Sequence, residues 1–413
     1  MQDKPKNTRR NTGDENMASK SHYKMTIRST VVASVLCVAG AAHAQGSVTL
    51  YGIADAGVMY LSHTTPGLND SKGTGHQFSM TNSGYSPSIW GLSGSEDLGG
   101  GLKATFKLES GISLANGGYD NPGANNGLFN RTAEVGLSSR FGTVTAGLQF
   151  SPFFLTVYEL DPRGFSEFGS MVTPMIDNSL IAALFMPNAV SYTSPDISGF
   201  QFAGLFGFGG VAGNFQNGRS WSVSAKYTNG TFLAGAAYIS VNNAADASLA
   251  SVGGLYPANV RAYTAGASYK FGGLTVKAAF TNFKANSAPV TNSSTDTSVN
   301  VYSGGADWFV LPYLDLNGGV YYQQDRVHSG SHSITAALGM QYFLSKRTAL
   351  YAQVGLVNNK CSANGQCLGS GLTVESAGSG VGGLQGNIGS AAAGAGLPPG
   401  TTFGGNVGIR VMF

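Results

Sequence analysis

The feature that most constrains this chain is a repeated alternation of apolar and polar residues. It is clearest in the stretch 89–111, whose second half reads LKATFKLE. Leucine, alanine and phenylalanine fall on one face there, while lysine, threonine and glutamate fall on the other. Alternation with a period of two predicts a β-strand with one apolar and one polar face. The glycine-rich turn SEDLGGG is too short for a helix, so the stretch predicts an antiparallel hairpin.

The same rhythm recurs along the chain and predicts sixteen strands. Besides the two strands of the hairpin, they are expected at 46–62, 129–139, 142–150, 188–194, 200–208, 219–228, 231–241, 260–271, 274–284, 298–310, 313–325, 332–344, 348–358 and 401–413. Short turns such as TNG, FGG and LP alternate with long connections. Strands of about 10 residues with this asymmetry are typical of a transmembrane barrel with short periplasmic turns and long outer loops. The sequence therefore predicts an all-β, sixteen-stranded antiparallel transmembrane β-barrel.

Two strands show which face should meet lipid. In the strand 313–325 we expect Leu316 and Val320 to point outward, with Asp315 and Asn317 pointing into the lumen. In the last strand Arg410 should point inward, between outward apolar neighbours. An apolar outer face and a polar lumen are what a water-filled barrel requires.

The composition favours a membrane barrel over a soluble sandwich. Charged residues are 11% of the chain, against about 25% in typical soluble proteins. Glycine reaches 60 residues and aromatic residues 11%. Beyond the leader, no stretch approaches ~18 consecutive apolar residues, so no membrane-spanning helix is expected.

The first 44 residues predict an exported protein. In residues 25–44 a basic residue precedes an apolar run that ends at Ala42-His43-Ala44, which fits a signal peptide cleaved after Ala44. An N-terminal anchor helix is the alternative, although the apolar run is short for spanning. Residues 1–24 are expected to be a disordered extension, and residues 45–413 the barrel domain.

The charge balance changes when the leader is removed. The leader holds seven of the 24 Lys and Arg residues and three of the 21 Asp and Glu residues. The mature chain therefore has 17 basic and 18 acidic residues, a net charge of −1. Nothing in this charge balance indicates nucleic-acid binding.

Two cysteines remain after the leader. Cys361 and Cys367 lie in a Gly/Asn/Ser-rich segment, and an exported chain meets an oxidising compartment, so a small loop disulfide is expected. Two free loop thiols are the alternative. Without a nearby histidine the pair makes a poor metal site, and no metal or cofactor is expected.

The alternation stops at residues 151–187, which contain several prolines. A long irregular loop inside a compact domain is usually functional. This segment is therefore the first place to look for the functional site.

Several separated segments carry a family resemblance. The hairpin GLSGSEDLGGGLKATFKLESG and the segments VTLYGIADAG, FNRTAEVGLSSRFGTVTAG, YFLSKRTALYAQ and NVGIRVMF resemble the general-diffusion porins of Gram-negative outer membranes, especially those of β-proteobacteria. The resemblance implies a homotrimer, a location in the outer membrane, and a third loop folded into the lumen as a constriction. It also implies that the terminal Phe413 is recognised by the outer-membrane insertion machinery.

The irregular segment falls where that third loop belongs. SEFGS at 166–170 looks like the family's acidic loop segment, which would place Glu167 at the narrowest point. Glu159, Asp161 and Asp177 are further candidates for acids of the constriction. The alternative for each is a carboxylate that only solvates the loop or caps its turns.

The family opposes the acidic loop with a wall of basic residues, and here this chain departs from the pattern. Arg131 matches a constriction arginine, and Lys103 and Lys107 should also face inward. By contrast, positions that look basic in close relatives hold Ile89, Ser93 and Leu148. Acids without an equal basic wall favour cations, so we expect weak cation selectivity.

The function expected from these features is passive diffusion of small hydrophilic solutes and ions. A substrate-specific channel for sugars or organic acids is the alternative, and an adhesive or structural barrel is another. A barrel enzyme would need a nucleophile beside a base. The sequence offers no such pair, so no enzyme is expected.

Overall fold

The computed structural model of the chain describes residues 47–64, 75–119, 127–178, 184–242, 257–287, 297–363 and 400–413. They belong to one compact unit, Gly46–Phe413. The predicted extension at 1–24 and the predicted signal peptide at 25–44 lie outside the described residues. None of the helices within the described ranges is long and apolar enough to span a membrane.

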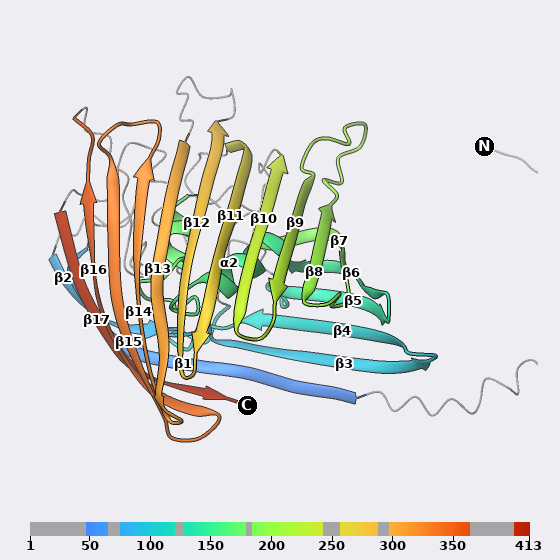
Figure 1. The fold of residues 1–413 in the computed structure, drawn as a ribbon, viewed down its shortest axis with the longest axis horizontal. Helices are drawn as coiled ribbons and strands as arrows, with labels where there is room; N and C mark the ends of the chain where they lie inside the picture. The colour runs from blue at the N-terminus through green and yellow to red at the C-terminus, as the bar shows by residue number, and fades with distance from the viewer. Residues whose placement is uncertain are drawn as a thin grey trace, which may run out of the picture. The chain divides into compact units, whose positions relative to one another are not determined.

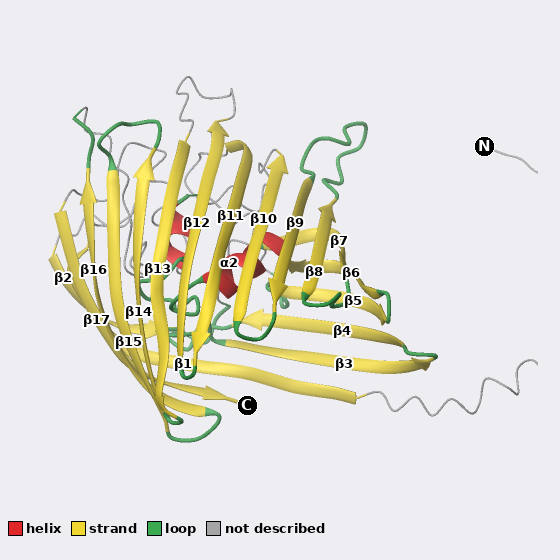
Figure 2. Ribbon diagram, in the orientation of Figure 1, coloured by secondary structure: helices red, strands yellow, loops and turns green. Residues whose placement is uncertain are grey.

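The described unit is built from one large antiparallel sheet with two short helices beside it (Figures 1 and 2). The strands are β1 Ser47–Thr64, β2 Gly75–Asn82, β3 Ile89–Gly99, β4 Leu102–Gly111, β5 Thr132–Ser139, β6 Gly142–Phe150, β7 Phe185–Thr193, β8 Phe200–Gly207, β9 Ser220–Thr228, β10 Phe232–Asn242, β11 Pro257–Phe271, β12 Leu274–Ser287, β13 Thr297–Leu311, β14 Leu314–Asp325, β15 His332–Phe343, β16 Thr348–Lys360 and β17 Gly400–Met412. The helices are α2 Pro152–Leu160 and α3 Val172–Asp177.

The sheet closes on itself because β1 pairs with β17 over Ile53–Leu61. On its other edge β1 pairs with β2 along one half and with β3 along the other. β2 and β3 therefore occupy one position in the barrel wall, interrupted between them by residues 83–88. The seventeen strands form a closed sixteen-stranded antiparallel barrel, which confirms the predicted fold class. Closure leaves none of the described strands at a free sheet edge, as spanning a membrane demands.

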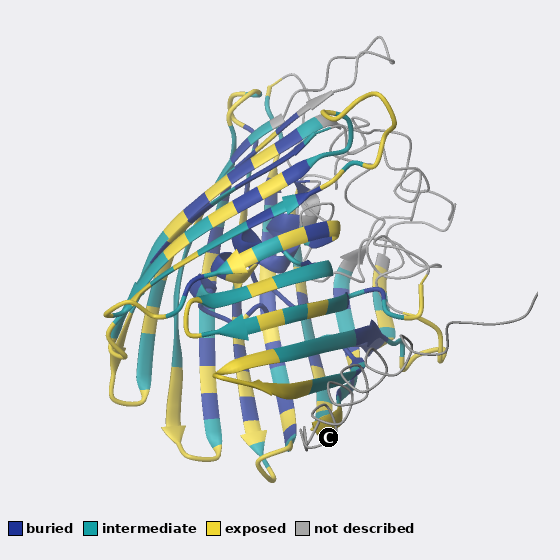
Figure 3. Ribbon diagram, turned by 90° about the vertical axis from the view of Figure 1, so that its right-hand side faces the viewer, coloured by how far each residue is buried: buried dark blue, intermediate teal, exposed yellow. Residues whose placement is uncertain are grey.

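Burial alternates along the strands, as the banded colouring of Figure 3 shows. On β14, Leu316 and Val320 are exposed on the outer face, whereas Asp315 and Asn317 are buried on the inner face. This confirms the predicted facing of that strand. The apolar side chains are exposed here because their partner in the membrane is lipid rather than protein.

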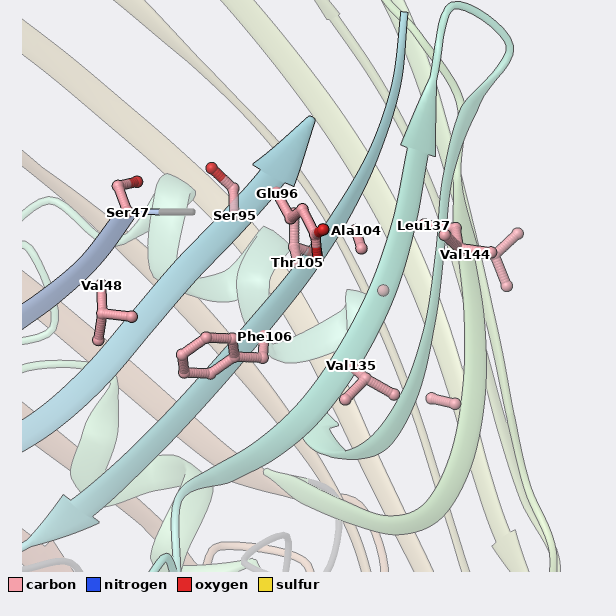
Figure 4. A pocket seen from close by; sticks show the side chains of 12 residues that line it. Ser47, Val48, Ser95, Glu96, Ala104, Thr105, Phe106, Val135, Leu137 and Val144 are labelled. Atoms are coloured by element: carbon pink, nitrogen blue, oxygen red, sulfur yellow. The ribbon is translucent and has the colours of Figure 1, made fainter. Parts of the chain in front are cut away.

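The outer face also carries a shallow apolar groove over β1 and β3–β6. Val48, Phe106, Val135 and Val144 line it, as Figure 4 shows. Small residues such as Ala104 lower the surface between these larger side chains.

Two segments differ from the sequence-based expectation. The strand β2, Gly75–Asn82, was not among the sixteen predicted strands. The segment 151–187, expected to be irregular, contains α2 and α3 and ends in β7. The segment 151–187 is ordered because it makes long-range contacts with the inner wall of the barrel.

Candidate functional site

Helix α2 begins at a signal that the sequence carries. Ser151 caps its N-terminus, with the hydroxyl oxygen accepting a hydrogen bond from Phe154 N at 3.0 Å, and Pro152 occupies the first turn. The helix ends at Leu160, after which Asp161 N donates to Val157 O at 3.0 Å. Residues 151–178 thus form a compact loop rather than an irregular one. This segment is called the inner loop below.

The inner loop packs against an apolar patch on the barrel's inner wall. Phe153, Phe154 and Val157 of α2 belong to one buried cluster with inward side chains of β10–β13. These are Ile239, Val241, Val260, Ala262, Phe283, Ala285, Val299 and Val301. A lumen wall would normally be polar. The apolar inner residues on these four strands are accounted for by the inner loop that covers them, and its helix α2 lies behind β10–β12 in Figure 2.

A buried arginine connects the inner loop to strand β16 of the barrel wall. Arg163 is 1% exposed and donates through Nη2 to the carbonyl oxygen of Phe168, at 3.1 Å, and to Oε1 of Gln353 on β16. Ser166 Oγ donates to the same Gln353 oxygen at 2.7 Å. Charge-assisted hydrogen bonds of this kind are the stronger class. They fix the loop segment that also contains Glu167.

Asp161 stabilises the inner loop by accepting hydrogen bonds from the loop's own backbone and from the barrel wall. Its carboxylate accepts from Phe165 N at 2.6 Å, from Met171 N at 3.2 Å and from the hydroxyl of Tyr321 on β14 at 2.7 Å. Burial raises the pKa of this carboxyl above its usual value. Asp161 was expected to line the constriction, but at 2% exposure it is turned into the loop instead.

Residues 83–88 form a second inward segment, in the interruption between β2 and β3. Asp55 of β1, which is fully buried, accepts hydrogen bonds from the backbone N–H groups of Gly84, Tyr85 and Ser86 at 3.0, 3.1 and 2.8 Å. The Tyr351 hydroxyl adds a fourth at 2.7 Å. One carboxylate therefore satisfies three consecutive backbone donors that the broken strand leaves free.

This inward segment supports the inner loop directly. Glu167 N donates to Tyr85 O at 3.2 Å, and Gln353 Nε2 donates to Gly84 O at 2.8 Å. Gln353 thus contacts both the inner loop and residues 83–88. The loop, the inward segment and β16 form one connected polar network inside the barrel.

The predicted basic residues meet an acid that was not among the predicted sites. Glu109 on β4 contacts Arg131 Nε at 2.8 Å and Lys107 Nζ at 3.1 Å, and accepts from the Tyr51 hydroxyl at 2.9 Å. Arg131 also lies over the rings of Phe150 and Phe185. Glu109 shares a strand face with Lys107, so strand alternation could have identified the pair. The single carboxylate therefore offsets one of the two positive charges.

Two inward lysines were also missed. Lys226 on β9 pairs with Glu159 of α2 at 2.7 Å. Lys277 on β12 donates to the backbone oxygens of Glu159 and Asp161 at 3.0 and 2.9 Å, where the end of α2 leaves carbonyl groups free. Periodicity on β9 and β12 places both lysines inward, but their partners on the loop could not be read from the sequence.

The other predicted site residues are placed as follows. Lys103 lies on the inner face beside the β3–β4 turn and is exposed. Glu167 is half-buried in the inner loop. The side chain of Asp177 and all of Cys367 lie outside the described residues, while Cys361 is disulfide-bonded. Phe413 O accepts from Gly52 N at 3.0 Å, so the chain end is paired with β1.

Comparison with known proteins places this arrangement among channels. The family model described as Gram-negative porin matches residues 29–362. "Outer membrane porin protein 32" of Delftia acidovorans is 32% identical over 358 residues, covering 81% of this chain and 90% of that protein. A second outer membrane porin protein, from Bordetella pertussis, is 31% identical over 389 residues, covering 81% of this chain and 95% of that protein.

Solved structures similar to this chain include outer-membrane porins as well. The structure titled "Anion-selective porin from Comamonas acidovorans" is 27% identical, with a TM-score of 0.69 over 89% of this chain and all of that one. OmpT of Vibrio cholerae, in a structure titled as its trimer form, is 15% identical, with a TM-score of 0.60 over 89% of this chain and 99% of that one. That second likeness shows the fold alone.

Proposed function

The chain belongs to the Gram-negative porin family, in the β-proteobacterial type, and from this we propose how its channel selects what passes. It is an outer-membrane channel for passive diffusion and not an enzyme. The proposal is that the inner loop narrows this channel and that small hydrophilic solutes and ions diffuse past it down their own gradients. This proposal is supported mainly by the hydrogen bond between Arg163 of the inner loop and Gln353 on the inner wall.

We further propose a weak preference for cations. Glu109 offsets one of the two positive charges of Arg131 and Lys107, which would attract anions, and Glu159 compensates Lys226. Ile89 and Ser93 place no basic group on β3. The relative titled anion-selective gives this preference no support, so it rests on the charges of this chain. Salt should weaken it, because the Debye length is about 8 Å at physiological ionic strength.

Single-channel recording in planar bilayers tests the channel. Protein folded from residues 45–413 should give stepwise conductance and, under a KCl gradient, a reversal potential that favours K⁺. A reversal potential that favours Cl⁻ would keep the channel and overturn the proposed selectivity. Folded protein without conductance would overturn the diffusion channel itself and favour an adhesive barrel.

Glu109→Gln gives a sharper test of the charge compensation. Removing this carboxylate leaves Arg131 and Lys107 uncompensated, so the K⁺/Cl⁻ permeability ratio should fall by about twofold, or about 0.4 kcal/mol. Glu96→Gln is the matched control, because Glu96 lies exposed on the outer face of β3. Equal ratios in the two variants would show that Glu109 does not set the selectivity.

We also propose a homotrimer inserted by the outer-membrane assembly machinery. Support for the trimer comes from the family to which the chain belongs. Support for Phe413 as the assembly signal comes from its aromatic side chain, which is 49% exposed at the end of the last strand. Conductance steps in groups of three would agree with the trimer, and isolated single steps would contradict it.

A further inference from the structure

Four polar side chains form a row across the outer face of the neighbouring strands β10–β13 (Figure 1). Arg261 on β11 is paired in register with Ser240 on one side and with Lys284 on the other. Lys284 on β12 is paired in turn with Ser298 on β13. The row faces outward, because the adjacent residues of the same strands belong to the apolar cluster on the inner face. Two cations flanked by two hydroxyl groups therefore face the membrane side of the wall.

The two cations of this row have no counter-ion among the described residues. Arg261 and Lys284 are both exposed, and no described carboxylate forms an ion pair with either of them. Within β10–β13 the acid is Asp307, whose register partner Asn317 is buried on the inner face, so Asp307 also points inward. Like charges directly opposite each other on neighbouring strands are destabilising. The pair therefore favours an anion that comes from outside the chain.

A row of aromatic rings on the same outer face indicates the level of the cations in the membrane. Tyr263 follows Arg261 by two residues on β11, and its ring centroid lies 5.9 Å from that of Phe280, which lies 5.1 Å from that of Tyr302. Aromatic girdles mark the two interfaces of an outer-membrane barrel. At ~3.4 Å per strand residue, the cations lie about 7 Å beyond Tyr263 toward the long outer connections. This is the level of the lipid headgroups in the outer leaflet.

We propose that Arg261 and Lys284 bind the phosphate group of an outer-leaflet lipid, with the hydroxyl groups of Ser240 and Ser298 as flanking donors. The planar fork of an arginine matches the oxygens of a phosphate, and a lysine adds a point charge. The apolar and aromatic side chains nearer the middle of the strands would contact the acyl chains of the same lipid. This site lies on the outer face of the wall, so it does not depend on the ion selectivity proposed above.

Native mass spectrometry of the full mature chain, folded in a non-ionic detergent, tests this site with diphosphoryl lipid A as the probe. We expect a bound lipid in the wild type, and we expect Arg261→Gln and Lys284→Gln each to weaken this binding by about fivefold. Lys346→Gln is the matched control, because it removes one positive charge from the exposed β15–β16 turn at the other end of the barrel. It should bind the lipid like the wild type.

The chemistry of the ligand is tested with two further probes. Lipid A without its phosphate groups should bind more weakly than the diphosphoryl form, and equal binding of the two would overturn a phosphate site. An equimolar amount of inorganic phosphate should leave the lipid bound, whereas displacement of the lipid would assign the pair to the free anion instead. Wild-type affinity in both glutamine variants would show that the two cations do not hold the lipid.

A charge-conserving variant guards against misfolding. Arg261→Lys keeps the positive charge and should bind the lipid more tightly than Arg261→Gln. All variants should retain the β-sheet circular dichroism of the folded barrel. Equal loss of binding in Arg261→Lys and Arg261→Gln would contradict a site in which the positive charge of this residue attracts the phosphate.

Discussion

Asp55→Ala is expected to lower the free energy of unfolding by about 3 kcal/mol, because a buried charged acceptor that holds four donors is lost. The three backbone N–H groups of residues 84–86 and the Tyr351 hydroxyl would be left to find water. Urea unfolding of the barrel in lipid vesicles measures the change. Open-channel current should also become noisier, since residues 83–88 support the inner loop.

The matched control for Asp55 is Asp97→Ala. Asp97 also lies at the inner face of the wall, but it is exposed near the end of β3 and accepts one short-range hydrogen bond, from Gly99 N. Its removal should change the free energy of unfolding by no more than about 0.5 kcal/mol. Equal stability of the two variants would mean that residues 83–88 keep their place without Asp55.

The strands could be predicted from the sequence because each strand face carries its own signal. On β14 the alternation indicated the inward Asp315 and Asn317 and the outward Leu316 and Val320, and all four lie as expected. Lipid and water act on every residue of a strand separately, so a local pattern is enough. The same argument indicated the inward Lys107, whose neighbour Glu109 lies on the same face.

The interior of the barrel could not be predicted in this way. The inward turn at residues 83–88 depends on Asp55 and Tyr351, which lie 296 residues apart in the chain. Asp161 looked like a pore acid because its neighbours are loop residues, yet Tyr321 on a distant strand helps to bury it. Helix α2 did carry a local signal in Ser151-Pro152. The helix was not predicted because its nine residues lie within a segment that contains several prolines.

The surface on which the inner loop packs is marked in the sequence by apolar residues at inward-facing strand positions, and periodicity alone does not explain them. Val260 and Ala262 of β11, like Val299 and Val301 of β13, are apolar where a lumen should be polar. A strand with two apolar faces is buried on both sides. In a barrel with lipid outside, the second cover must come from within. The apolar inner faces of β10–β13 therefore indicate which part of the wall the inner loop covers.

Arg163→Met is expected to release the inner loop while leaving its volume nearly unchanged. One hydrogen bond from a charged donor to β16 would be lost, worth about 1.5 kcal/mol, so the population of loops detached from β16 should rise about 10-fold. Hydrogen exchange of the peptide 152–178 measures this directly. Single-channel current should show larger and more frequent fluctuations, because a detached loop no longer narrows the pore steadily.

The control and the partner variant make the Arg163 result specific. Arg140→Met removes the same charge from the exposed β5–β6 turn and should leave both measurements unchanged. Gln353→Ala should loosen the loop further, because it also removes the bond from Ser166, and the double variant should fall short of the sum of the two effects by the contact that the two side chains share. Fully additive effects, or exchange in Arg163→Met as slow as in the wild type, would show that the loop is held mainly by its apolar contacts with β10–β13. In that case α2, rather than Arg163, would fix the width of the channel.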